Sequence, residues 1–450
     1  MQSTDPLRTF YKTLEGEGEK PLTPDHPYYV DIFGATPRKD PIRRLWQRID
    51  VSSSESVNLL TGFRGNGKST ELLRLKKMLE ESGCTVFLVN MLDYLLMTKP
   101  VELSDFILSL MAALSHAVGE DKELNLQPLT NSYWDRLTDF LHSEVEIEKL
   151  GLKIKAGVGA ADLGMKLKTE PDFKQRIQKH LRGHLTRLIE DAQKFVDELV
   201  LAIRKETGDP DKKVVFLVDS VEQLRGLGGD AEKVYASVRE LFSGQAGRLA
   251  LPKLHVVYTV PPFLLALSQN LGRNLGGHPV TQWPNIHVRK KEDDGQDVDG
   301  IAVMKQIISN RYADWNNIFK PEGLGSLAAV SGGDLRDFFR LIRECLVSCM
   351  LDSEPEKMAD QEIIERAVLD LKHDKQPLAL TDNNARWLAK VHLSKKEELS
   401  SVNELPLLAS YLDNNLIVNY LNKHGELWYD IHPVLIKGIQ KRGFLDTKAQ

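Results

Sequence analysis

Residues 62–69, GFRGNGKS, have the types and spacing needed to hold a phosphate group. They fit the pattern G-x-x-x-x-G-K-[ST], after a predicted strand and before a predicted helix. Glycines let backbone N–H groups turn toward a β-phosphate, and the helix start adds partial positive charge. Lys68 would neutralise the phosphates and Ser69 would bind Mg²⁺, whereas the alternative is a glycine-rich turn that happens to precede a lysine. We predict an ATP site formed by Gly62, Arg64, Gly65, Asn66, Gly67, Lys68, Ser69 and Thr70.

A second candidate for binding the nucleotide and its metal is Asp219, which follows the apolar run Val214–Val218. An aspartate at the carboxyl end of such a strand places its carboxylate beside the Mg²⁺ of a bound nucleotide. We therefore predict that Ser69 and Asp219 hold Mg²⁺. The alternative is an ordinary aspartate at the end of a strand.

A base for hydrolysis is expected close to Asp219. The residue directly after it is Ser220, and the nearest acid is Glu222. Many ATPases of the additional-strand class have a glutamate where this chain has Ser220. Either Glu222 activates the attacking water, or hydrolysis is slow. The alternative role for Glu222 is a helix-capping or salt-bridging acid.

Three further side chains could act on the γ-phosphate. Thr259 ends an apolar run and could hold the attacking water, or it could bond to local backbone. Arg273 lies in the loop NLGRNLGG and could reach the γ-phosphate of a neighbouring subunit, or it could be solvated. Arg336 lies in the first turn of a predicted helix and could sense the γ-phosphate, or it could lie in an exposed turn.

The composition is that of an ordinary globular protein, with 450 residues, 42% hydrophobic, 27% charged, and a net charge of −5. Three cysteines exclude a disulfide scaffold and suit a reducing cytoplasm. The first twenty residues are polar and acidic, unlike a signal peptide. The longest apolar stretches, 106–118 and 254–267, fall short of the roughly 20 residues that span a bilayer. We expect a cytoplasmic protein of two or three domains with no membrane segment.

Apolar runs that alternate with helical patterns predict an α/β fold with a parallel sheet and flanking helices. The expected strands are 57–60, 84–91, 214–218, 254–260 and 286–288. Alternating residues at 152–158 and 163–167 predict a β-hairpin. The helical period at 171–205 predicts one long helix, or two that separate near Gly183.

Together these stretches resemble the AAA+/STAND group of P-loop ATPases. The matching segments are GFRGNGKS, VVFLVDS, YTV and SGGDLRDFFRLIRE, within roughly residues 40–92 and 211–350. The acid three residues after Asp219 is similar to the D-D-x-[DE] spacing of STAND, KAP-type and ORC-like ATPases, although Ser220 replaces their second aspartate. The resemblance implies ATP bound between subunits, assembly into rings or arcs, and a switch that acts on a partner.

The patterning and the resemblance predict four segments. These are an N-terminal arm that prolines keep extended (1–50), a P-loop core (51–300, with an insert at about 120–210), a helical lid (301–375) and a winged-helix-like domain (376–450). The last resembles winged helices because LPLLASYLDNNLIVNYLNKHGELWYDIHPVLIKGI has a helix, two strands joined by a turn, and another helix. Between residues 403 and 436 its one cation is Lys423, so it is a poor match for DNA phosphates.

The insert is the more basic surface. Between Lys149 and Arg187, ten cations stand against three acids, a local charge of +7. This surface could bind nucleic acid or an acidic protein, or it could be a solvated face. The predicted function is a Mg²⁺-dependent ATPase that forms homo-oligomers and switches an effector protein, with a bacterial antiphage system as one biological role. The alternatives are a non-hydrolysing scaffold for an effector and a DNA-loading ATPase.

Overall fold

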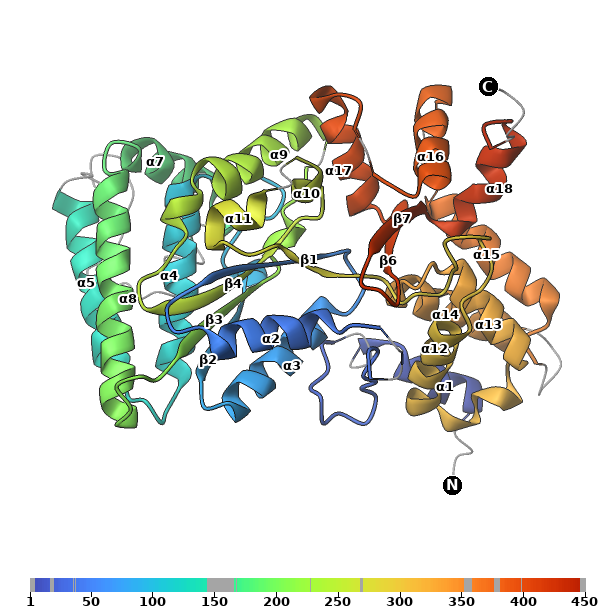
Figure 1. Cartoon of the computed structure of the whole chain (residues 1–450), viewed down its shortest axis with the longest axis horizontal. Coiled ribbons are helices and arrows are strands. Elements are labelled where there is room, and N and C mark those ends of the chain that lie inside the picture. Colours follow the sequence, from blue (N-terminus) through green and yellow to red (C-terminus); the bar gives the residue numbers. More distant parts are fainter. Residues whose placement is uncertain are drawn as a thin grey trace. The chain divides into compact units, whose positions relative to one another are not determined.

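A five-stranded sheet forms the core of the α/β fold (Figure 1). The computed structural model describes residues 5–16, 20–34, 36, 38–143, 166, 168–226, 228–267, 270–351, 358–375, 381–397 and 399–445. The strands are β1 (Val57–Gly62), β2 (Thr85–Asn90), β3 (Val214–Asp219), β4 (Leu254–Val260) and β5 (Thr281–Trp283). Their order is β2-β3-β4-β1-β5, and the pairs β2–β3, β3–β4 and β4–β1 are parallel.

Every residue of β1, β3 and β4 is buried. Parallel strands covered on both faces appear in a sequence as continuous apolar runs, which is why these three strands are visible in this sequence. The predicted α/β class, with a parallel sheet and flanking helices, is confirmed. The order places β4 between β1 and β3, so the strand before GFRGNGKS and the strand that ends in Asp219 are not adjacent.

The predicted fifth strand at 286–288 is wrong. The strand in this part of the chain is β5, which ends at Trp283 just before Pro284, a residue without an N–H to continue the ladder. The backbone N–H of Asn285 donates instead to Asn419, and that of Ile286 donates to Gly333. These contacts hold the apolar stretch in an irregular conformation.

The chain forms two compact units. One contains Met1–Pro41, Gly62–Leu73 and Gln282–Gln450, and the other contains Ile42–Thr61 and Arg74–Thr281. The loop with the phosphate-binding pattern therefore belongs to the unit that contains residues 282–450. The four-segment division stays a prediction.

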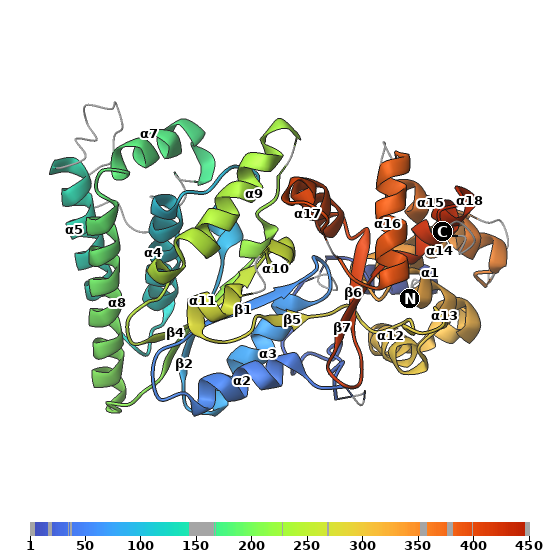
Figure 2. The ribbon, with the colours of Figure 1, turned by 45° about the horizontal axis from the view of Figure 1, so that its top comes forward.

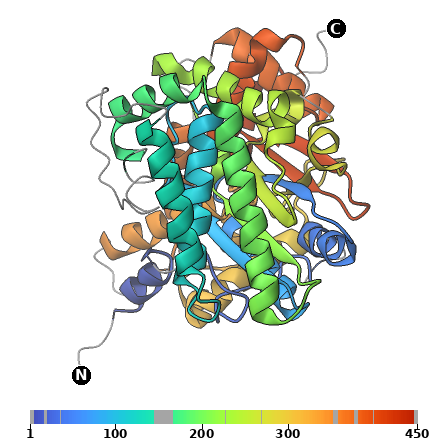
Figure 3. The same cartoon turned by 90° about the vertical axis from the view of Figure 1, so that its left-hand side faces the viewer.

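Helices cover the sheet in the unit that contains most of it. They are α2 (Pro41–Val51), α3 (Lys68–Glu81), α4 (Leu103–Glu120), α5 (Gln127–Ser143), α7 (Pro171–Leu181), α8 (Leu185–Thr207), α9 (Ala231–Arg239), α10 (Phe263–Leu267) and α11 (Leu271–Gly276). Figure 3 shows α4, α5 and α8 side by side as three long helices. Among the described residues, no helix has both the length and the apolar character that a membrane span needs.

The insert is partly described. The predicted hairpin at 152–158 and 163–167 lies outside the described residues, except for Lys166. The helical stretch consists of two helices, α7 and α8, and Gly183 lies in the turn between them, as the sequence indicates. At the start of α4, Gln178 donates to Asp105, and Arg182 pairs with Glu102 at 2.6 Å, so α7 is anchored on α4.

The other unit is mostly helical and contains a small antiparallel hairpin (Figure 2). Its elements are α1 (Pro6–Thr13), α12 (Val298–Arg311), α13 (Pro321–Val330), α14 (Leu335–Leu351), α15 (Gln361–Lys375), α16 (Asp382–Ser394), α17 (Leu405–Asp413), β6 (Ile417–Leu421), β7 (Leu427–Ile431) and α18 (Pro433–Lys441). The predicted hairpin joined by residues 422–425 matches β6 and β7.

The expectation of an extended arm missed α1. Its Phe10 is fully buried and stacks on Tyr312, with ring centroids 4.6 Å apart. Pro6 lies at the start of the helix and Asp5 caps it, so the proline here begins a helix. The arm is therefore packed onto its unit through an aromatic side chain.

Candidate functional site

The loop that follows β1 has the backbone shape that phosphate binding needs. β1 ends at Gly62, and α3 begins at Lys68. Gly65 and Gly67 have φ values of +90° and +88°, which side-chain-bearing residues rarely adopt. Alternation of such residues with right-handed ones turns successive N–H groups toward one point, and the free N–H groups at the start of α3 add to them.

Lys68 is held inside this loop. Its side chain is buried, and its Nζ donates to the carbonyl oxygen of Phe63 at 2.7 Å. A phosphate oxygen is a stronger acceptor than this carbonyl because it is charged. The ammonium group can therefore exchange its bond within the loop for bonds to a phosphate. Ser69 follows directly, half-buried in the first turn of α3.

The loop is braced from behind by Trp283 at the end of β5. The buried Asn66 donates from Nδ2 to the Trp283 carbonyl at 3.0 Å, and the indole Nε1 donates to the Asn66 carbonyl at 2.8 Å. A Cβ on Gly62 would lie 2.5 Å from the same Trp283 carbonyl, so only glycine fits there. Asn66 thus supports the loop. Trp283 was missed by sequence reasoning because no local pattern marks a partner that lies 217 residues away.

The arm meets the start of α3. The backbone N–H of Leu22 donates to the Thr70 hydroxyl at 3.1 Å, and the Tyr29 hydroxyl donates to Glu71 at 3.3 Å. Thr70, predicted to bind the cofactor, therefore holds the arm through its side chain. Its place in the first turn of α3 still leaves its backbone N–H facing the loop end of the helix.

Arg336 lies against the loop, at the second position of α14. Its Cβ and Nε are 3.2 and 3.5 Å from the place that a Cβ on Gly65 would occupy. Its side chain is exposed, while Asp334, two residues earlier, is fully buried. Asp334 caps α14 by accepting from the backbone N–H of Asp337 at 2.9 Å. Burial, and then the charge of Asp337, raise the pKa of Asp334 to about 6.

In the other unit, the end of β3 has an unusual turn. Asp219 is buried and accepts from the N–H of Ser220 at 2.7 Å. Ser220 has a φ of +69°, and a short 3₁₀ turn over Val221–Gln223 then places Glu222 in a buried position. Any residue with a Cβ is strained in this left-handed conformation, and the serine carries that strain.

Thr259 lies near the end of β4, next to β3. It is fully buried; its hydroxyl donates to the carbonyl of Val218 at 3.2 Å and accepts from the N–H of Val221 at 3.0 Å. These two bonds to local backbone fix the turn before Glu222, and the role of Thr259 in holding the attacking water stays a prediction. Arg273 lies on α11 with an exposed side chain, so its role toward a neighbouring subunit stays a prediction.

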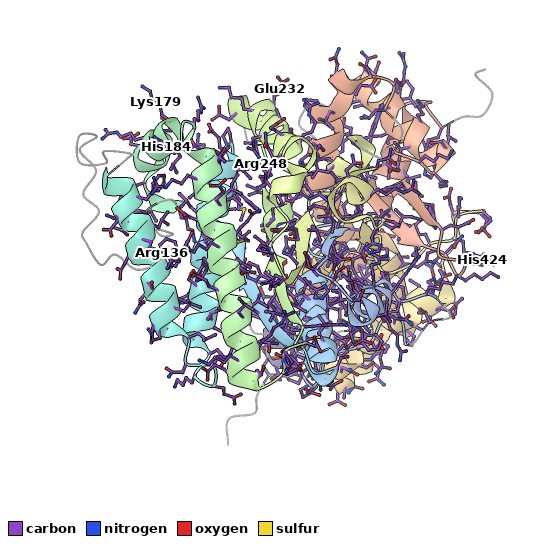
Figure 4. All side chains as sticks on the ribbon, turned by 60° about the vertical axis from the view of Figure 1, so that its left-hand side comes forward. Arg136, Lys179, His184, Glu232, Arg248 and His424 are labelled. Atoms are coloured by element: carbon purple, nitrogen blue, oxygen red, sulfur yellow. The ribbon has the colours of Figure 1, made fainter. Side chains whose placement is uncertain are left out.

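Some cations of the basic insert make contacts within the chain. Figure 4 shows Lys179 pointing outward from α7. Of its other cations, Arg182 is paired with Glu102, and the Arg187 guanidinium lies 4.8 Å from the centre of the Phe140 ring. Lys149, Lys153 and Lys155 lie outside the described residues. The predicted nucleic-acid surface is therefore untested.

One group of acids and a histidine could hold a metal ion by distance. The ligand atoms of Asp294, His392 and Asp430 lie within 4.8 Å of one another. The Nζ of Lys395 lies 2.7 Å from Asp294 and 3.0 Å from Asp430, so an ammonium group already pairs with both carboxylates. This is an ion-pair network that fastens α16 and β7 to the loop at 294.

No protein-family model matches the chain, and no curated protein matches it. The chain is similar to two solved structures of the Aeropyrum pernix ORC2 protein. The ADP form has a TM-score of 0.39 and 12% identity over 99% of both chains, and the ADPNP-ADP complexes have 0.38 and 11% over 98% of this chain and 99% of that one. Cdc6p from Pyrobaculum aerophilum has 0.33 and 12% over 94% and 99%. Since these TM-scores are below 0.5, the fold is assigned from the chain's own strand order.

Proposed function

We propose that this protein binds ATP with Mg²⁺ and acts as an AAA+/STAND-type ATPase that switches between nucleotide states. The observation that carries the proposal is the loop after β1. Two glycines at positive φ, a buried Lys68 whose Nζ donates to the Phe63 carbonyl, and a helix that begins at that lysine form the proposed phosphate cradle. The strand β4 between β1 and β3 is the arrangement of the additional-strand class of P-loop ATPases.

The proposed roles follow from the side-chain chemistry. Lys68 neutralises the β- and γ-phosphates, and the oxygens of Ser69 and Asp219 are the proposed ligands of Mg²⁺. Bound Mg²⁺ would neutralise charge that grows on the phosphates during transfer. Arg336, on the helix packed against Gly65, is the proposed sensor of the γ-phosphate.

Hydrolysis is proposed to be slow, with Glu222 as the base. The serine at position 220, where many related ATPases have an acid, supports a second candidate function, a scaffold that binds ATP without hydrolysing it. In both cases nucleotide binding would change the shape of the chain and so its fit to an effector protein. We propose assembly into a homo-oligomer, with an antiphage system as one biological setting and DNA loading, through the basic insert, as the other.

The test is a pair of lysine variants in the same helix. Lys68→Ala should weaken binding of a fluorescent ATP analogue by at least about 100-fold, because hydrogen bonds to charged groups contribute about 1.5–3 kcal/mol each. Lys76→Ala is the matched control, since Lys76 is partly exposed and forms only a 3.7 Å pair with Glu80. Equal affinity in folded Lys68→Ala protein would refute the nucleotide site.

A further inference from the structure

Asn415 joins three parts of one unit through a single amide group. It lies between α17 and β6, and only 8% of its surface is exposed. Its Nδ2 donates to the carbonyl oxygen of Arg64 at 2.8 Å and to Oδ2 of Asp334 at 2.7 Å. Arg64 belongs to the phosphate-binding loop, and Asp334 caps the helix that carries Arg336. We call residues 405–441, which contain α17, β6, β7 and α18, the C-terminal segment. This segment is therefore bonded directly to the proposed nucleotide site.

Asn415 is an unfavourable choice if its only role is stability. Its backbone is left-handed, with a φ of +52°, which asparagine, aspartate and glycine all tolerate, so the backbone alone does not require this amide. Its Oδ1 is buried without a hydrogen-bond partner among the described residues. Buried polar atoms without partners are uncommon in folded proteins, and strained or unsatisfied groups concentrate at functional sites. The amide is thus retained for the two bonds that its nitrogen makes.

A second contact ties the same helix turn to α15 and to the C-terminal segment. Nζ of Lys375 lies 2.6 Å from the Asp337 carboxylate, and Nε2 of His432 lies 3.3 Å from it. Burial would raise the pKa of Asp337, but the neighbouring His432 and Lys375 outweigh burial and hold that pKa well below its ordinary value. Burial lowers the pKa of His432, which fits a neutral ring that caps α18. Arg336 therefore lies between Asp334 and Asp337, and contacts from α15 and the C-terminal segment hold both of these residues in place.

The glycine turn before α14 completes this contact. The Tyr420 hydroxyl donates to the carbonyl of Gly332 at 3.0 Å. A Cβ on Gly332 would lie 3.0 Å from Pro433 and 3.3 Å from Val418. The turn has no room to shift while β6 and α18 stay packed on it. Movement of α14 away from the loop would therefore require β6 and α18 to move with it.

We propose that Asn415 is a positioning residue that couples nucleotide occupancy of the P-loop to docking of the C-terminal segment. The inference rests on the proposed nucleotide binding. A bound nucleotide fixes the backbone of the loop, including the Arg64 carbonyl that Asn415 holds. Docking of the segment in turn keeps Arg336 against the loop, so the segment slows nucleotide release. Coupling between two binding equilibria is reciprocal, and each should therefore strengthen the other.

The decisive variant is Asn415→Asp, which keeps the size and tolerates a left-handed backbone. It replaces a donor by a carboxylate that faces the Asp334 carboxylate and the Arg64 carbonyl, so both bonds are lost. Loss of two bonds of this kind should speed release of a fluorescent ADP analogue by on the order of 10-fold or more in stopped-flow mixing. Asn125→Asp is the matched control, because Asn125 also has a positive φ (46°) but is exposed.

A second change separates coupling from general damage. Asp334→Asn in the Asn415→Asp background restores one donor–acceptor pair with the roles exchanged, and an asparagine still caps α14. This pair should recover several-fold of the lost residence time. In hydrogen exchange, nucleotide should slow amide exchange of β6 in the wild type and have little effect on it in Asn415→Asp.

The outcomes are distinguishable. A wild type that binds no nucleotide refutes the proposed function. A wild type that binds nucleotide, with Asn415→Asp releasing it at the same rate, overturns the coupling alone. Fast release that the second change fails to slow, with no difference in β6 exchange, also overturns it. If Asn415→Asp does not fold, Asn415→Gly removes the amide without backbone strain and carries the same test.

Discussion

Gly65 offers the most direct test of the loop geometry. Its φ is +90°, and an alanine in such a conformation costs about 1–3 kcal/mol. A Cβ would also lie only 3.2 Å from Cβ of Arg336. In Gly65→Ala the loop can relieve this strain by turning its N–H groups away from the phosphate. Binding ATP would then require the loop to take up this strain of about 1–3 kcal/mol again, so the ATP affinity should be about 5- to 150-fold weaker.

Gly83 is the control for this substitution. Its φ is +87°, and nothing lies within 4 Å of a Cβ placed on it. Gly83→Ala should lower the free energy of unfolding by about 1–3 kcal/mol without changing ATP affinity, because Gly83 lies outside the phosphate-binding loop. Thermal unfolding and titration with a fluorescent ATP analogue measure the two effects. Unchanged affinity in Gly65→Ala, or equal loss in both variants, would refute the link between loop backbone and phosphate.

Two further predictions concern turnover and assembly. Glu222→Gln keeps the shape of the buried side chain and removes the base, so phosphate release should fall by about 10²-fold while ATP still binds; an unchanged rate would assign the role elsewhere. If the exposed Arg273 acts on a neighbouring subunit, mixing Arg273→Ala with Lys68→Ala protein should restore part of the turnover that each lacks alone, and a monomeric wild type with full activity would exclude this.

The sequence predicts the central strands well for a physical reason. β3 and β4 are buried on both faces, and their runs VVFLV and LHVVYTV are nearly continuous and rich in β-branched residues, as such strands require. The stretch 286–288 is also apolar, yet its backbone hydrogen bonds join it to Gly333, to Asp297 and to itself rather than to a strand. Local patterns cannot distinguish these cases because the partner decides them.

The site is predictable to the same extent. The positions of Gly65, Gly67 and Lys68 follow from a contiguous motif whose spacing states its own geometry. The bond from Asn415 to Arg64 joins residues 351 positions apart and leaves no local signal. Thr259 shows a further limit, since its position near a strand end is visible in the sequence but the two backbone groups that engage its hydroxyl are not.

The backbone at Ser220 also constrains how this chain can evolve. A φ of +69° is left-handed, a conformation that costs a residue with a Cβ roughly 1–2 kcal/mol and that glycine adopts freely. The serine already carries this strain, and the bond from the Val221 N–H to Thr259 helps to hold the turn. A glutamate at this position would inherit the same backbone, so its side chain would leave the chain in the direction that the turn sets. An acid that reaches a nucleotide from this position would therefore require the turn over residues 219–223 to be rebuilt at the same time.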